Sequence, residues 1–141
     1  MHADDLQRHA LHGIGTHCLN TFLWVLQGFL AAMFLTAGTL KLTQPRSKLE
    51  SFMPWVKDFS TPVARSVGVA ELLGAIGLVV PALVDKAVWL SPLAAAGLGL
   101  LMLLAAIFHF RKAEWSEVTF NAVIVVVATI VAIFRFGPNA F

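Results

Sequence analysis

Four long apolar segments alternate with shorter polar segments along the 141-residue chain. The apolar segments cover residues 21–40, 63–84, 87–110 and 115–136. Each approaches the roughly 20 residues that a helix needs to cross a hydrocarbon core of about 30 Å. None alternates apolar and polar residues with the period of two that a strand of a membrane β-barrel shows. The pattern therefore predicts an all-α integral membrane protein with four transmembrane helices.

The lengths of the connections predict how these helices are arranged. The second and third segments, and the third and fourth, are joined by only a few residues. Because short connections make neighbouring helices antiparallel, we expect an up-down-up-down four-helix bundle. Small residues four positions apart, such as Ala128 and Ala132, predict close packing between its helices.

The segments outside the apolar blocks have distinct compositions. Residues 46–60, in the long connection, carry apolar residues at helical spacings, so we expect an amphipathic segment lying in the membrane interface. Residues 1–20 form a polar, histidine-rich N-terminal segment, and residues 137–141 form a short C-terminal tail. The first twenty residues do not resemble a short basic signal peptide, so we expect them to remain in the mature protein.

The composition agrees with a membrane protein and excludes several classes of function. Hydrophobic residues make up 58% of the chain and charged residues 13%, against roughly 45–50% and 25% in soluble domains. The lipid bilayer is therefore the first expected partner. A net charge of +2 is too small for a nucleic-acid footprint. The single cysteine, Cys18, excludes an intramolecular disulfide and dithiol chemistry within the chain.

The distribution of lysine and arginine predicts the orientation in the membrane. The positive-inside rule places the long connection and residues 111–114 in the cytoplasm and both termini outside. The side predicted to be cytoplasmic holds seven basic residues: Lys41, Arg46, Lys48, Lys57, Arg65, Arg111 and Lys112. The opposite side holds three: Arg8, Lys86 and Arg135.

A carboxylate lies in the second apolar segment, where insertion scales give an acidic residue a cost of roughly 2.5–3.5 kcal/mol. The alternating direction of the helices places Glu71 in the same half of the membrane as Lys41, His109 and Asn121. We expect Lys41 to be the counter-charge of Glu71, with His109 as the second choice. The other half of the bundle is expected to be almost purely apolar.

Two readings of this polar cluster stay open. It can fix the register of the helices, as a buried polar residue does, or it can form a ligand or proton-transfer site. For the second reading, the candidate catalytic residues are Glu71, His109 and Lys41. The candidate ligand-binding residues are Asn121, Gly38 and Gly74.

The histidines offer little support for a metal centre. The N-terminal segment contains His9, His12, His17 and Cys18, which are residue types that bind zinc or copper, but their spacing matches no standard zinc module. Gly13 and Gly15 argue against a helix there, so we expect a loose tail and no metal site. Only His109 lies within a predicted membrane helix, so bis-histidine haem ligation would need a partner chain.

Three motifs in order resemble the DoxX-like family of small four-helix membrane proteins. They are "FLTAGTLKL" at 34–42, "GVAELLGAIGLVVP" at 68–81 and "GLGLLMLLAAIFHFRKAE" at 97–114. The resemblance covers roughly residues 20–136. It implies a bacterial inner-membrane protein, because founding members are similar to subunits of a thiosulfate:quinone oxidoreductase and others belong to oxidative-stress complexes. Distant eukaryotic relatives act as cargo receptors or receptor-assembly factors, with cytosolic termini that conflict with the charge count above.

Two functional predictions follow from the residues and the resemblance. The first is a membrane subunit associated with a quinone-linked oxidoreductase, with a polar site for a quinone-like ligand, in which another protein subunit supplies the redox centre. The second is a non-enzymatic module for lipid binding or for membrane-protein assembly or cargo. Both predictions are compatible with a homo-oligomer. The cysteine pairs of redox-active relatives are absent here, so the chain itself is not expected to run a thiol relay.

Overall fold

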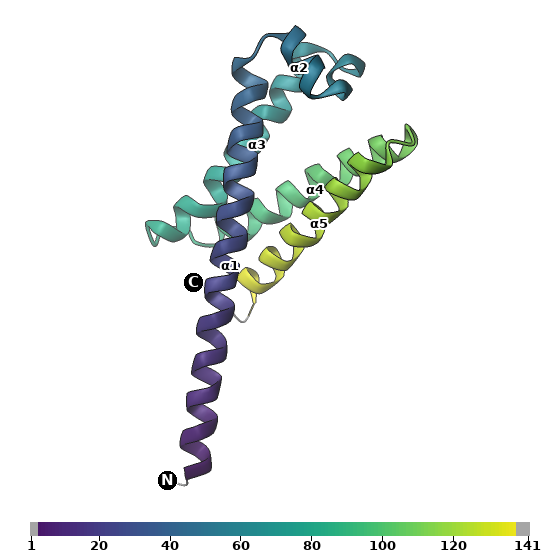
Figure 1. Cartoon of the computed structure of the whole chain (residues 1–141). Helices are drawn as coiled ribbons and strands as arrows, with labels where there is room; N and C mark the ends of the chain where they lie inside the picture. The colour runs from purple at the N-terminus through teal and green to yellow at the C-terminus, as the bar shows by residue number, and fades with distance from the viewer. Residues whose placement is uncertain (1–2, 138–141) are drawn as a thin grey trace.

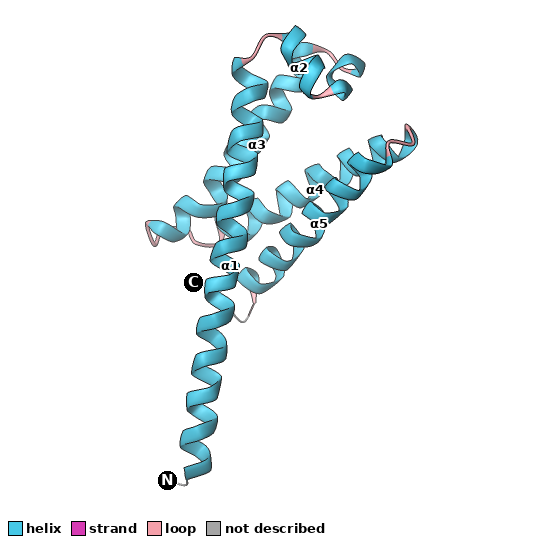
Figure 2. Cartoon of the chain, in the orientation of Figure 1, coloured by secondary structure: helices cyan, strands magenta, loops and turns pink. Residues whose placement is uncertain are grey.

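The computed structural model describes the backbone of residues 3–137 and the side chains of residues 13–137. Every element within this range is a helix (Figure 2). The elements are α1 (Ala3–Thr43), α2 (Arg46–Phe52), η1 (Pro54–Asp58), α3 (Thr61–Leu83), α4 (Leu90–Arg111) and α5 (Trp115–Phe136). In the described residues, α1, α3, α4 and α5 are long and apolar enough to cross a membrane. The predicted all-α fold with four membrane-length helices is confirmed.

The first helix is much longer than the sequence pattern predicts. It covers 41 residues, or about 60 Å at 1.5 Å per residue, and so exceeds the thickness of a hydrocarbon core. Its N-terminal part projects away from the other helices (Figure 1). The expectation that Gly13 and Gly15 prevent a helix here was wrong. Each glycine lowers helix propensity by about 1 kcal/mol but still donates and accepts the backbone hydrogen bonds of a helix, and the Thr16 hydroxyl also donates to the Gly13 carbonyl at 2.8 Å.

The starts of α3 and α4 also differ from the predicted ones, for local reasons. Helix α3 begins at Thr61 and not at residue 63, because Pro62 fits the first turn of a helix, where its missing N–H costs nothing. Helix α4 begins at Leu90 and not at residue 87. Asp85 and Ala87 have φ values of 50° and 51°, and the left-handed conformation is incompatible with a continuous right-handed helix.

The long helices pack in sequence, α1 against α3, α3 against α4, and α4 against α5, with a smaller contact between α1 and α5. Figure 1 shows α4 and α5 lying side by side. The up-down-up-down order of all four helices stays a prediction. The core that joins them consists of buried residues from each long helix: Leu30, Phe34, Ala75, Leu78, Ala95, Leu98, Met102, Ile124, Ala128, Val131 and Ala132.

Glycine residues allow the closest approaches between helices. A Cβ atom at Gly38 would lie 2.7 Å from the Gly68 carbonyl oxygen, and one at Gly68 would lie 2.8 Å from the Lys41 Cβ. Between α3 and α4, a Cβ atom at Gly74 would lie 2.5 Å from the Leu98 Cδ2. Such contacts hold membrane helices together where no hydrophobic force acts between them.

Replacing Gly38 with alanine should therefore destabilise the bundle by about 1 kcal/mol, because the cost of overpacking against backbone exceeds the gain in helix propensity. Gly28→Ala is the matched control in the same helix, since nothing lies within 4 Å of a Cβ atom there. This control should leave stability unchanged or raise it by up to about 1 kcal/mol. Melting temperatures in detergent measure both effects, and equal shifts for the two variants would contradict the close α1–α3 contact.

The connection between α1 and α3 folds into a small helical unit, called the cap here and defined as residues 46–58. Helix α2 ends before Pro54, which begins η1. The cap packs through buried Leu49 and Val56 against Ala64 of α3, and Arg46 donates from Nη1 to the Thr61 hydroxyl at 3.0 Å. The helical character of the predicted segment at 46–60 is thus present, whereas its position in the membrane interface stays a prediction.

Candidate functional site

A buried ion pair joins α1 to α3 at the cap end of the bundle. The Lys41 ammonium donates to both carboxylate oxygens of Glu71, with distances from Nζ of 2.8 Å to Oε1 and 2.7 Å to Oε2. Lys41 is 4% exposed and Glu71 is 3% exposed. The predicted counter-charge is therefore in place, and the carboxylate is compensated by a direct contact with a cation.

Residues of α1, α3 and the cap surround the Lys41–Glu71 pair. Lys41 ends the buried stripe of α1, and Glu71 lies in the middle of the buried stripe of α3. The missing side chain of Gly68 leaves room for the lysine stem. Trp55 of η1 covers the ammonium, with the Nζ atom 5.8 Å from the ring centroid, close enough for a cation–π contact. The surroundings are thus hydrophobic and aromatic on the side of the cap.

His109 is also buried, at 7% exposure, but it belongs to a second pair. Its Nδ1 atom lies 2.5 Å from the Glu114 Oε2 atom. Among the described residues, no hydrogen bond or ion pair joins His109 to Lys41 or Glu71. The role of His109 as a second partner of Glu71 is therefore not realised in this structure, and Glu114 takes that place.

Three aromatic side chains connect the two pairs. Trp55 contacts Phe59 with ring centroids 5.8 Å apart, Phe59 contacts Phe108 at 5.1 Å, and Phe108 contacts the His109 ring at 5.3 Å. We call Trp55, Phe59 and Phe108 the aromatic bridge. It connects the cap, through Phe59 just before α3, to the last turn of α4.

An exposed ion pair strengthens the same junction. Lys112 of the α4–α5 turn donates to the Asp58 Oδ2 atom of η1 at 2.5 Å. This hydrogen bond to Asp58 raises the pKa of Lys112, and so do the charges of Asp58 and Glu114, so the side chain is cationic at neutral pH. The junction between cap and turn is therefore both aromatic and ionic.

The three predicted ligand-binding residues lie at or near helix contacts. Asn121 is buried and donates from Nδ2 to the Glu117 carbonyl within α5, at 2.8 Å. Gly38 faces α3, and Gly74 faces α4. Their ligand-binding role stays a prediction, and their observed contacts are those of helix packing.

The expectation that the other half of the bundle is almost purely apolar was wrong. Arg135 of α5, 2% exposed, donates from Nε to the Gln27 Oε1 atom and from Nη1 to the Asn20 Oδ1 atom, both at 2.7 Å. Gln27 donates in turn from Nε2 to the Leu78 carbonyl of α3 at 2.8 Å. The Trp24 ring lies 5.5 Å from the guanidinium carbon. Four polar or aromatic side chains thus form a second cluster linking α1, α3 and α5.

The helical spacing of buried positions could have predicted this second cluster from the sequence. Buried positions on α1 recur at residues 23, 27, 30, 34, 38 and 41, so Gln27 shares its stripe with Lys41. On α5 they recur at residues 121, 124, 128, 131 and 135, so Arg135 shares its stripe with Asn121. Because Arg135 lies at the end of an apolar segment, a count of flanking charges assigns it to the membrane surface. Projection onto a helical wheel would have placed it inside.

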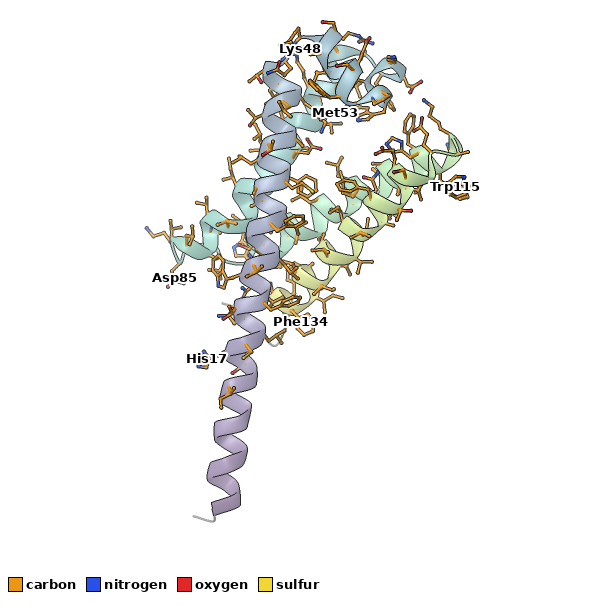
Figure 3. The ribbon with its side chains drawn as sticks, in the orientation of Figure 1. His17, Lys48, Met53, Asp85, Trp115 and Phe134 are labelled. Atoms are coloured by element: carbon orange, nitrogen blue, oxygen red, sulfur yellow. The ribbon has the colours of Figure 1, made fainter. Side chains whose placement is uncertain are left out.

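The described side chains hold no group of three or more metal-ligating residues. His17 and Cys18 are exposed on the projecting part of α1 (Figure 3). The side chains of His9 and His12 lie outside the described residues.

Comparison with known proteins identifies a family. A model of the DoxX-like family matches residues 25–131, a range that includes the Lys41–Glu71 pair, the cap, the aromatic bridge and Gln27. Comparisons with curated proteins and with solved structures found no significant match.

Proposed function

Since this chain belongs to the DoxX-like family, we propose that it is the membrane subunit of a quinone-linked oxidoreductase and binds a quinone-like ligand at the cap end of its bundle. A partner subunit supplies the redox centre, in the bacterial inner membrane. The observation that carries the proposal is the combination of the buried Lys41–Glu71 ion pair, the His109–Glu114 pair and the aromatic bridge between them.

This combination suits a flat ring with carbonyl or hydroxyl groups. The aromatic bridge offers ring faces and edges against which such a ligand stacks. The Lys41 ammonium has three N–H donors, of which two are used by Glu71. The third donor then hydrogen-bonds a ligand oxygen, and the His109 imidazole accepts a hydrogen bond from a ligand hydroxyl. Binding and orienting a cofactor in this way is the usual contribution of the protein.

An apolar groove near the same end supports a place for an isoprenoid tail. It lies on the outer face of α1, has a volume of about 430 Å³, and has Met53 of the cap in its lining. Its lining is otherwise Phe29, Ala32, Met33, Thr36, Ala37 and Leu40. Leu40 of the groove lining directly precedes Lys41 in the sequence. Met53 packs in the same small hydrophobic cluster as Trp55.

Tryptophan fluorescence tests this proposal directly, because Trp55 belongs to the proposed site. A variant that keeps Trp55 and carries phenylalanine at residues 24, 89 and 115 is titrated in detergent with a short-chain ubiquinone. We expect saturable quenching. The matched control keeps Trp89 alone, which is 59% exposed at the start of α4 and reports only the partition of quinone into micelles. Equal, non-saturating quenching in both variants would refute a specific site at the cap.

One observation favours a second candidate function. A larger groove of about 600 Å³ lies between α3 and α4, and its lining from Ala70 to Leu104 is apolar. A groove with no polar side chain suits a lipid chain or another transmembrane helix, as in a lipid-binding or assembly module. A larger side chain at Gly77 or Ala94 would fill part of this groove. If such a variant still retained a phospholipid or a partner protein, the groove would not be its binding site.

A further inference from the structure

The α4–α5 turn holds Glu114 directly over His109 by backbone geometry. The Glu114 N–H donates to the His109 carbonyl at 3.1 Å, and the Ala113 N–H donates to the Phe110 carbonyl at 3.1 Å. These two bonds define a Schellman motif, with Ala113 in the left-handed conformation at φ 59°. The backbone therefore fixes where the Glu114 side chain starts, and its carboxylate returns to the imidazole of the residue five positions earlier.

The chemistry of the two groups decides which imidazole nitrogen carries the proton. An ionised carboxylate only accepts hydrogen bonds. At 2.5 Å from Oε2, Nδ1 must then be the donor in the neutral ring, which leaves the Nε2 lone pair as the acceptor. Among the described residues, no hydrogen bond reaches Nε2.

The charges around the pair support an ionised Glu114. Its side chain is 36% exposed, whereas that of His109 is 9% exposed. The Lys112 ammonium lies 3.7 Å from the Glu114 Oε1 atom and is itself held by Asp58. Glu114 thus has access to water and a neighbouring cation on one side, and the buried imidazole on the other.

We propose that Glu114 is the positioning residue of His109: it holds the imidazole as the Nδ1–H tautomer and keeps Nε2 ready to accept a proton from a ligand hydroxyl. In that step the ligand O–H bond breaks, the Nε2–H bond forms, and the electron pair stays on the ligand oxygen. The imidazolium is stabilised by the Glu114 carboxylate and later gives its proton to water. The proton-transfer part rests on the proposed ligand site, whereas the tautomer assignment does not.

Nitrogen-15 NMR of the full-length protein in detergent tests the assignment without any ligand. Spectra are recorded over a pH series that extends to the plateau at which the ring signals no longer change, so that the neutral ring is observed, and the His109 signals are those lost in His109→Gln. We expect the wild type to favour the Nδ1–H tautomer by at least about tenfold, as a hydrogen bond to a charged group would. Glu114→Ala should remove this preference, and Glu114→Gln should restore it, because the amide oxygen also accepts a hydrogen bond.

Glu117→Ala is the matched control, since Glu117 is an exposed acid in the first turn of α5 and its side chain has no hydrogen bond to His109. It should leave the tautomer ratio at the wild-type value. A wild-type ring protonated at Nε2, or an unchanged ratio in Glu114→Ala, would overturn the proposal. Since no quinone is present, either outcome is independent of whether the quinone titration succeeds.

Discussion

Lys41→Met should destabilise the bundle by about 3 kcal/mol, because it leaves the Glu71 carboxylate buried without its counter-charge. Both side chains are nearly inaccessible, and both carboxylate oxygens depend on the one ammonium. Glu71→Leu should cost a similar amount by stranding Lys41. Unfolding in mixed detergent, followed by circular dichroism, measures these losses.

The double variant Lys41→Met/Glu71→Leu separates the structural role of the pair from its use. Replacing both partners of a buried ion pair with apolar residues is often neutral or stabilising, so we expect most of the lost stability to return. If the pair also holds a ligand, this stable variant should still lose the saturable quenching of Trp55. A stable double variant that binds quinone like the wild type would leave the pair as a device for fixing the α1–α3 register.

Gln27→Leu should cost about 2 kcal/mol, the largest loss of stability expected outside the Lys41–Glu71 pair. The substitution removes the acceptor of a hydrogen bond from the buried Arg135 guanidinium and the donor to the Leu78 carbonyl. Hydrogen bonds to charged groups contribute about 1.5–3 kcal/mol, and values within membranes fall toward the lower end because separated helices find other partners. The same unfolding assay measures this loss.

Asn20→Ala is the matched control for the second cluster. Asn20 also accepts a hydrogen bond from Arg135, but it is exposed at the edge of the bundle, where water replaces the lost partner. We expect a loss under about 1 kcal/mol. Equal losses for Gln27→Leu and Asn20→Ala would show that burial of the glutamine does not contribute.

The two polar clusters join the helices at different heights along α1. The Lys41–Glu71 pair fixes α1 against α3 at the cap end, and Gln27 with Arg135 fixes α1 against α3 and α5 about 21 Å along α1, at 1.5 Å per residue. Apolar side chains slide past one another at little cost in lipid, whereas a slipped polar pair leaves unsatisfied groups. We therefore expect the two clusters together to select one register for α1, α3 and α5.

The sequence by itself determined the four membrane-length helices, because hydropathy over about twenty residues is a local property that lipid selects directly. It also determined that Glu71 needs a partner and that Lys41 is the nearest candidate, since one carboxylate in an apolar segment admits few solutions. Only the tertiary structure decided that His109 pairs with Glu114, because that contact depends on a Schellman turn with Ala113 in a left-handed conformation. Likewise, only the rotation of each helix about its axis brought Gln27 and Arg135 inside, since the direction in which a side chain points is set by packing against the neighbouring helices and not by the hydropathy of its own segment.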